Sequence, residues 1–379
     1  MALVTGTALA SIALVLGLTR LGSLSEGPLS FALRTVGSMV GRVEGGIIQR
    51  IRGPGRTAEL AWLEPLRSVS DSLRQPDRLL FGAYTDGVPS TLEGITDLER
   101  SLATTFPLIQ LYTAWGDEPA QHFPRRVLDA IATLGSIPVV TWEPWLSTFE
   151  PRLHPQLPLR AERDRNGLSG VARGDYDFYI DAWAREAAAF QRPILVRFAH
   201  EMNDPYRYPW GPHNNAPQDF IGAWRRVVDR FRAAGATNVL WVWSPHVAYA
   251  GYEVYWPGDD YVDWVGTGVL NYGTVAYWSG WWSFQEIFGT RYDFLAGFGK
   301  PIMIAELASL TVGGDRADWY RQAFSDLGRY PAVRALLFFH VDDDRTVTRQ
   351  ALDWSFAGDS TTLTAVREGM RRFQSGPEG

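Results

Sequence analysis

The chain has 379 residues, of which 46% are hydrophobic, and its formal net charge is -6. This length fits one domain of about 250–300 residues with an N-terminal extension. The acidic balance argues against a nucleic-acid partner, because phosphate binding needs a basic surface. The absence of cysteine excludes disulfides, thiolate metal ligands and a cysteine nucleophile.

The first 19 residues contain no charged side chain and are numerous enough to cross a bilayer. We expect residues 1–27 to be a signal peptide or membrane anchor, which predicts a secreted or cell-envelope protein. Arginines follow this segment, from Arg20 to Arg56. Positive charge beside a membrane span favours the cytoplasmic side, which conflicts with export. A misassigned start and a fragment of a longer membrane protein are the alternatives.

Residues 28–75 are Arg-rich, with Gly-Pro-Gly at 53–55 and a helical stretch at 57–73, and are expected to form a linker or stalk. From residue 76 to residue 375, short apolar runs alternate with amphipathic stretches. Helices are expected at 176–190, 220–234 and 317–327. The apolar runs predict eight strands, at 79–84, 107–115, 137–145, 193–201, 238–246, 263–272, 301–309 and 334–342.

Nearly continuous apolar strands separated by helices indicate a parallel sheet that is buried on both faces. Eight such units in about 300 residues fit a closed (β/α)8 barrel, the TIM barrel, better than an open sheet. No glycine-rich phosphate fingerprint follows the first strand, which argues against a dinucleotide-binding fold. The predicted fold class is therefore an α/β barrel, and no cofactor is expected.

The chain contains 16 tryptophans, an unusually large number. A buried indole needs a partner for its N–H group, so some of these rings are expected on the surface. Flat exposed rings suit the apolar faces of sugars and suggest a carbohydrate ligand. A large aromatic core explains the same composition, and both interpretations remain open at this point.

Polar and aromatic side chains follow several of the predicted strands, where a barrel presents its reactive groups. These candidates are Trp142, Glu143 and Trp145 after strand 3, His200, Glu201 and Asn203 after strand 4, Trp243 after strand 5, Tyr272 after strand 6, Glu306 after strand 7, and His340 after strand 8.

Glu201 and Glu306 are the two carboxylates expected to converge, because strands 4 and 7 face each other across a barrel mouth. Cleavage of a glycosidic bond needs two carboxyl groups, about 5–5.5 Å apart for retention and about 6.5–9.5 Å apart for inversion. The sequence leaves this choice open. Arg197 has the strand position to support these carboxylates, and Tyr272 is expected to hydrogen-bond the nucleophile. Glu143 is the competing carboxylate, with binding as its expected role.

A catalytic metal is not expected, because the histidines and acids show no HExxH or similar spacing. The run Asp342-Asp343-Asp344 is interpreted as a solvated loop.

Several motifs together resemble glycoside hydrolase family 26. They are RFAHEMN at 197–203, YPWG at 208–211, WVWSP at 241–245, YWPGDDYVDWVG at 255–266 and PIMIAELAS at 301–309. The resemblance covers about residues 79–356 in the family's order. It implies a retaining endo-β-glycanase, with Glu201 as acid/base and Glu306 as nucleophile. It also implies that His200 and Tyr272 lie in the −1 sugar site and that Trp210 is a sugar platform.

The resemblance leaves the sugar open. Most family members cleave β-1,4-mannan, and others cleave mixed-linkage β-1,3-1,4-glucan (lichenase) or β-1,3-xylan. Mannanases commonly place a tryptophan on strand 8, where this chain has Phe338-Phe339-His340, and WEPW at 142–145 resembles non-mannanase members. We expect a monomeric β-1,4-mannanase or related enzyme. An envelope-polysaccharide trimming enzyme and a carbohydrate-binding barrel without turnover are the alternatives.

Overall fold

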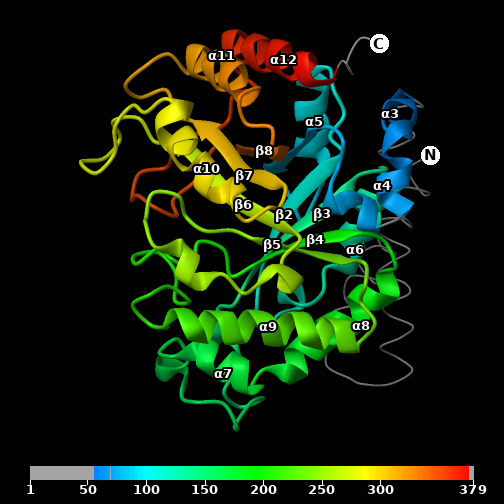
Figure 1. The fold of residues 1–379 in the computed structure, drawn as a ribbon, viewed down its shortest axis with the longest axis vertical. Helices are drawn as coiled ribbons and strands as arrows, with labels where there is room; N and C mark the ends of the chain where they lie inside the picture. Colours follow the sequence, from blue (N-terminus) through cyan, green and yellow to red (C-terminus); the bar gives the residue numbers. More distant parts are fainter. Residues whose placement is uncertain (1–54, 69, 375–379) are drawn as a thin grey trace, which may run out of the picture.

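The structure is a computed structural model that describes residues 55–68 and 70–374. In this part of the chain, eight parallel strands form a closed barrel in chain order, with helices outside it (Figure 1). The strands are β1 (Leu80–Thr85), β2 (Leu108–Ala114), β3 (Ile137–Glu143), β4 (Ile194–Phe198), β5 (Val239–Trp243), β6 (Trp264–Asn271), β7 (Ile302–Ser309) and β8 (Val333–His340). The predicted (β/α)8 barrel is confirmed, and each predicted run overlaps one strand.

The α-helices that cover the barrel are α5 (Glu93–Leu102), α6 (Arg125–Thr133), α7 (Gly167–Arg173), α8 (Asp177–Phe190), α9 (Pro217–Ala233), α10 (Thr290–Ala296), α11 (Arg316–Leu327) and α12 (Ser360–Gln374). The three predicted helices correspond to α8, α9 and α11. Helix α9 illustrates the local causes. Pro217 occupies its first turn, and the Asp219 carboxylate accepts a hydrogen bond from the Ala216 N–H group.

The outer face of the barrel packs against the helices through the largest apolar cluster of the described residues. Helix α9 contributes Phe220, Trp224, Val227 and Phe231, which recur at helical spacing and are all buried. Burying such side chains contributes about 1.5–3 kcal/mol each. This layer holds the strands in place, so the strand ends form a rigid support for a site.

The barrel interior is closed at its N-terminal end by residues 55–68 and 70–74. This segment forms α3 (Gly55–Glu59), α4 (Glu64–Ser68) and 3₁₀ turns at Ala61–Leu63 and Ser70–Arg74. Its Leu60, Leu63, Leu66 and Leu73 belong to one apolar cluster with the inward-facing strand residues. The prediction of a linker up to residue 75 is therefore wrong for these residues, because their leucines pack against the barrel.

The predicted anchor at residues 1–27 and the first part of the predicted linker lie outside the described residues. Among residues 55–68 and 70–374, no helix has the length and apolarity needed to cross a bilayer.

Candidate active site

Glu201 lies three residues beyond the end of β4, in a backbone turn of unusual conformation. Ala199 and Glu201 have φ angles of 44° and 53°, which place both in the left-handed region. Non-glycine residues there cost about 1–3 kcal/mol each and persist where neighbouring contacts impose the geometry. The Glu201 N–H group donates to the Ser244 carbonyl at 2.7 Å, and that of Ala199 donates to the Trp142 carbonyl at 3.1 Å. The flanking strands thus hold the turn.

Glu306 lies within β7 and faces the barrel interior because the strand contains a bulge. Ile304 and Leu307 pack in the outer layer, whereas Ala305 belongs to the interior cluster. The register with β8 shifts between Ile304 and Leu307, and Glu306 pairs with Gly268 of β6. A bulge redirects a side chain in this way. Strict alternation would have turned Glu306 toward the helices.

Glu306 is buried and bound to a cation. Arg197 Nη1 donates to its Oε1 at 2.6 Å, and the Tyr112 hydroxyl donates to the same atom at 2.7 Å. Burial raises the pKa of Glu306, but the charge and hydrogen bond of Arg197 and the bond from Tyr112 outweigh it, so this pKa lies below its usual range. Arg197 is fully buried and is held by Ser244 Oγ at 3.0 Å and Thr141 Oγ1 at 3.4 Å. The site therefore keeps Glu306 ionised.

Glu201 and Glu306 converge on one space. A Cβ atom placed on Gly268 would lie 3.7 Å from Glu201 Oε1 and 3.7 Å from Glu306 Oε2. These two oxygens are therefore at most twice that distance apart. This bound is compatible with the separation of about 5–5.5 Å used for retention. Because Gly268 has no side chain, the space between the carboxylates stays open.

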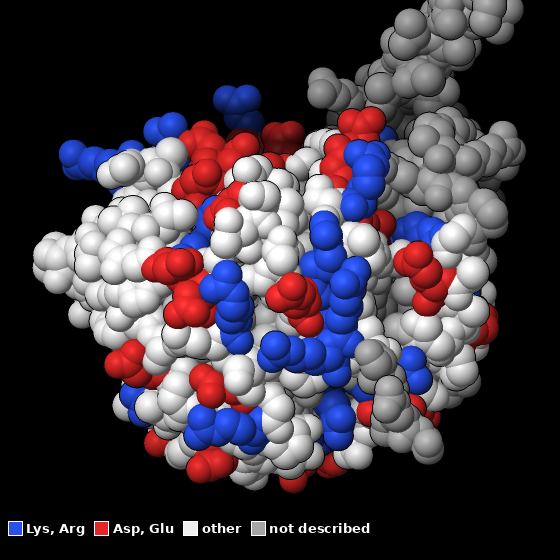
Figure 2. All heavy atoms as spheres, turned by 90° about the horizontal axis from the view of Figure 1, so that it is seen from above, with Lys and Arg blue, Asp and Glu red and all other residues white. Residues whose placement is uncertain are grey.

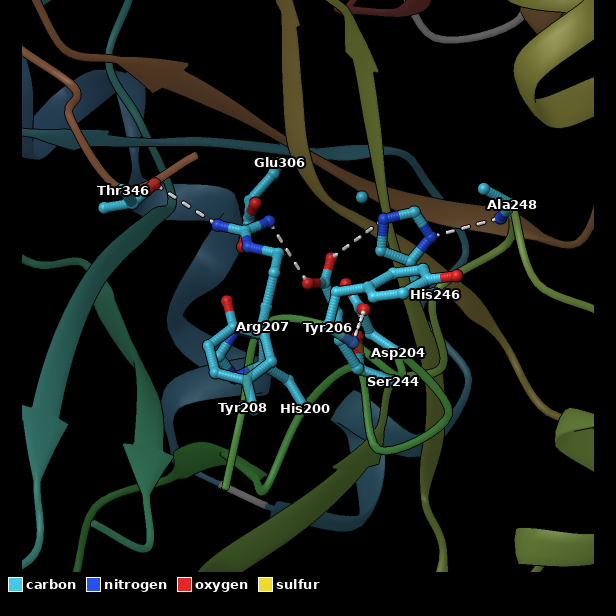
Figure 3. A network of polar contacts seen from close by, with 12 residues as sticks. His200, Asp204, Tyr206, Arg207, Tyr208, Ser244, His246, Ala248, Glu306 and Thr346 are labelled. Carbon is cyan, nitrogen blue, oxygen red and sulfur yellow. Dashed lines mark hydrogen bonds and ion pairs between the residues drawn. The ribbon is translucent and has the colours of Figure 1, made fainter. Parts of the chain in front are cut away.

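Arg207 lies beside both carboxylates, as Figure 3 shows for Glu306. Its Nη1 is 3.4 Å from Glu201 Oε2, and its Nη2 donates to Thr346 Oγ1 at 3.2 Å. Burial lowers the pKa of this guanidinium, but the charge of Glu201 outweighs burial and raises it. Arg207 thus supplies a permanent positive charge and connects the loops that follow β4 and β8.

His246 approaches Glu201 from the loop after β5. Its Nδ1 accepts from the Ala248 N–H group at 3.1 Å (Figure 3). This leaves Nε2 facing Glu201 Oε1 at 4.0 Å. Asn203 holds this loop: its Oδ1 accepts from the His246 N–H group, and its Nδ2 donates to the His246 and Tyr249 carbonyls. The amide of Asn203, predicted to bind substrate, is therefore used to position the backbone.

Glu201, Asp204 and His246 bring three possible ligand atoms within 4.8 Å of one another. Asp204 also accepts a hydrogen bond from the Tyr206 N–H group at 2.7 Å. We still expect no catalytic metal here, because a carboxylate that exchanges protons cannot at the same time bind a cation. This expectation stays a prediction.

His200 and Glu143 lie at the same mouth. His200 Nε2 contacts the Tyr208 hydroxyl at 2.9 Å, and burial lowers the pKa of this imidazole, followed by the charge of Arg197. His200 is therefore neutral. Burial raises the pKa of Glu143, whose Oε2 accepts from Trp145 Nε1 at 3.1 Å.

Three tryptophans that were predicted to contact sugar are instead covered by other side chains of the protein. Trp142 is 0% exposed and lies among Trp115, Tyr179, Trp183 and Phe231. Trp243 is 0% exposed and packs against Trp256 and Phe298. Trp210 is 2% exposed, donates to the His200 carbonyl and stacks on Tyr208. These predictions are wrong, because a covered ring face cannot receive a sugar.

His340 and Tyr272 differ from the predictions in another way. His340 faces the helix layer, where Nε2 accepts from the N–H groups of Phe356 and Ala357 and burial lowers its pKa to about 4. Its predicted contact with substrate is wrong. Tyr112, and not Tyr272, donates the hydroxyl hydrogen bond to Glu306. Tyr272 contacts the rings of Trp278 and Trp354 instead.

Tyr112, Arg207 and His246 belong to the site but were not predicted from the sequence. Tyr112 lies in a predicted strand and shares the parity of the inward-facing Leu108, so strand alternation is a signal that identifies it. Arg207 and His246 lie in loops with no periodicity. Only the fold brings them to Glu201.

Part of this chain matches a known family of enzymes. A model of glycosyl hydrolase family 26 matches residues 174–292, which include Arg197 and Glu201. "Endoglucanase H" from Acetivibrio thermocellus is 31% identical over 309 residues, or 79% of this chain and 31% of that relative. Residues 174–292 therefore match glycosyl hydrolase family 26. The family resemblance of the motifs is thereby confirmed.

Other proteins similar to this chain have different names. "Beta-1,3-xylanase TXYA" from a Vibrio species is 36% identical over 104 residues, covering 26% of this chain and 21% of that protein. The chain thus spans about a third or less of the length of these curated relatives. A β-mannanase of family 26 from Bacteroides ovatus aligns over 80% of this chain and 91% of its own, with a TM-score of 0.56 and 15% identity. That likeness supports the fold alone.

Proposed function

We propose that this chain is a retaining endo-β-glycanase, with Glu201 as acid/base and Glu306 as nucleophile. The observation that carries the proposal is the contrast between the two carboxylates. Glu306 accepts short hydrogen bonds from Arg197 and Tyr112, which lower its pKa, while Glu201 faces the same space with only a longer contact of 3.4 Å to Arg207 Nη1. An ionised nucleophile opposite a proton donor is what double displacement needs.

In the first step, Glu306 attacks the anomeric carbon while Glu201 donates its proton to the leaving glycosidic oxygen. In the second step, Glu201 takes a proton from water, the water oxygen attacks the same carbon, and Glu306 leaves as a carboxylate. Arg197 and Tyr112 stabilise that carboxylate as it returns. His200 is neutral and is proposed to orient the sugar, together with Trp145 and Glu143 at the mouth.

The proposed substrate is a β-linked polysaccharide. The two curated relatives reported above are named an endoglucanase and a β-1,3-xylanase, which supports this class. β-1,4-Mannan is the first candidate from the family's frequency. Mixed-linkage glucan is the second, favoured by the endoglucanase that aligns with 79% of this chain.

The test is release of reducing sugar by the full chain from β-mannan, lichenan, β-1,3-xylan and cellulose. We expect cleavage of one polymer, loss of several orders of magnitude in Glu306→Ala, and partial recovery of Glu201→Ala by azide on an activated substrate. Glu162→Ala, at an exposed carboxylate, is the matched control. Retention of configuration is read by NMR from the first anomer formed.

If the folded protein binds a polymer without cleaving it, the proposal is refuted and the chain is a carbohydrate-binding barrel instead. Near-normal rates in both glutamate variants would refute the residue assignment.

We propose that residues 1–27 direct this monomeric enzyme to the cell envelope or outside the cell. The charge-free segment at 1–19 supports this proposal. Fractionation of the producing cells, with and without residues 1–27, tests it. Cytoplasmic protein in both cases would refute it.

A further inference from the structure

The loop after β6 presents aromatic rings to solvent. Tyr277 is fully exposed at 101%, Trp278 is 43% exposed and Trp282 is 41% exposed. No charged residue occurs from Tyr272 to Gln285. We call residues 273–282 the rim loop. In Figure 1 it is the yellow segment that projects on the left, and the left edge of Figure 2 is largely free of charged groups.

The rim loop is attached to the barrel at both ends. At its start, the Thr274 N–H group donates to the Val312 carbonyl at 3.0 Å. At its end, the Trp282 N–H group donates to Asn271 Oδ1 at 3.2 Å, and the Trp282 carbonyl accepts from Trp319 Nε1 at 2.8 Å. The backbone at both ends of the loop is therefore held before any ligand binds, which reduces the entropy lost on binding.

The rim loop continues directly from the catalytic centre. Gly268, which lies between the two carboxylates, and Tyr272 are four residues apart, or about 13 Å at the rise of a strand. Tyr272 contacts the Trp278 ring edge-on at 5.2 Å between ring centroids and the Trp354 ring at 4.9 Å. Tyr272 thus links the buried ring of Trp354 to the exposed ring of Trp278.

We propose that Tyr277 and Trp278 form a platform for sugar residues of the polymer that lie outside the catalytic centre. This inference rests on the proposed function and specifies how that site selects long chains. Exposed apolar patches on soluble proteins mark binding surfaces. A sugar polymer fits this one because it must leave the barrel mouth, its C–H faces match aromatic rings, and the loop carries no charge to attract an ionic partner.

The experiment compares kcat/KM on the polymer cleaved in the screen with kcat/KM on a short aryl glycoside of the same sugar. The variants are Tyr277→Ala, Trp278→Ala and their combination. We expect the polymer-to-glycoside ratio to fall about tenfold in the double variant, and Trp278→Phe to recover part of it. Phe294→Ala, at a 48% exposed ring on α10, is the matched control and should leave the ratio unchanged.

A second readout is independent of turnover. In the Glu306→Ala background, retention on the insoluble polymer should weaken when Tyr277 and Trp278 are replaced, and remain unchanged with Phe294→Ala. The platform proposal is overturned if the enzyme is active but the rim-loop variants change neither the polymer-to-glycoside ratio of kcat/KM nor the retention on the polymer. A rim-loop variant that alters only the sedimentation of the protein or its binding to phospholipid vesicles also overturns it. An inactive wild type contradicts the proposed function instead.

Discussion

Replacement of Arg197 by methionine is expected to destabilise the barrel strongly and in a pH-dependent way. Arg197 and Glu306 form a buried ion pair at 2.6 Å, with side chains 0% and 8% exposed. Removal of one partner from a buried pair costs about 3–5 kcal/mol, because the remaining charge has no compensation. Methionine retains much of the apolar volume, so the loss reports mainly on charge and hydrogen bonds.

The sign of the pH dependence follows from the lowered pKa of Glu306 in the folded enzyme. A depressed carboxyl pKa contributes stability above the unfolded pKa, and that stability is lost as pH falls through the folded pKa. Without Arg197, burial dominates and raises the pKa of Glu306. Glu306 then destabilises the fold at neutral pH and does so less once it is protonated. The difference in unfolding free energy between wild type and Arg197→Met should therefore shrink as pH falls.

The assay is urea unfolding of both proteins at pH 7 and at about pH 4. The double variant Arg197→Met/Glu306→Gln is the control, and it should recover a large part of the stability at pH 7 because no carboxylate remains. In the single variant, the acidic limb of the kcat/KM profile should move to higher pH. A loss of stability independent of pH, with no recovery in the double variant, would refute the ion-pair argument.

Three further predictions concern the centre, the core and metals. Gly268→Val places methyl groups between the carboxylates, so kcat/KM should fall at least about 100-fold with little change in the urea midpoint; near-normal kinetics would contradict this geometry. Trp142→Ala should lower the free energy of unfolding, measured in urea, by about 3–5 kcal/mol, because this ring lies in the core. The folded fraction should keep its kcat, and a selective loss of kcat would show that Trp142 takes part in the site. EDTA should leave the rate unchanged, since Glu201 exchanges protons; a rate lost on chelation and restored by Zn²⁺ would contradict the metal-free mechanism.

The fold and the carboxylate pair were predictable from the sequence. The order of apolar runs and helices depends on local periodicity, which sets eight strands and their closure. Once a barrel is assumed, the positions of Glu201 after β4 and Glu306 within β7 mark them as the candidate pair, although not the direction of the Glu306 side chain. The eight strands at 80–340 are confirmed within a few residues at each end.

The direction in which individual side chains point, inward or toward the helices, was less predictable. Trp142 and Trp243 are next to polar strand ends, yet both point into the helix layer because their inward neighbours are Thr141 and Ser244, which hold Arg197. The same alternation turns His340 outward. The leucines of residues 55–74 carried no visible sign that they close the barrel, since their partners are distributed over all eight strands.

The sequence by itself determined the barrel and supplied two glutamates at opposite strands. Only the tertiary structure decided that Glu306 faces inward, because the bulge in β7 reverses the direction that alternation predicts. The favourable contact that accompanies this bulge is the ion pair with Arg197, which lies 109 residues earlier in the chain. Local backbone preferences cannot encode a contact over that distance, and closure of the barrel is what brings the two charges together.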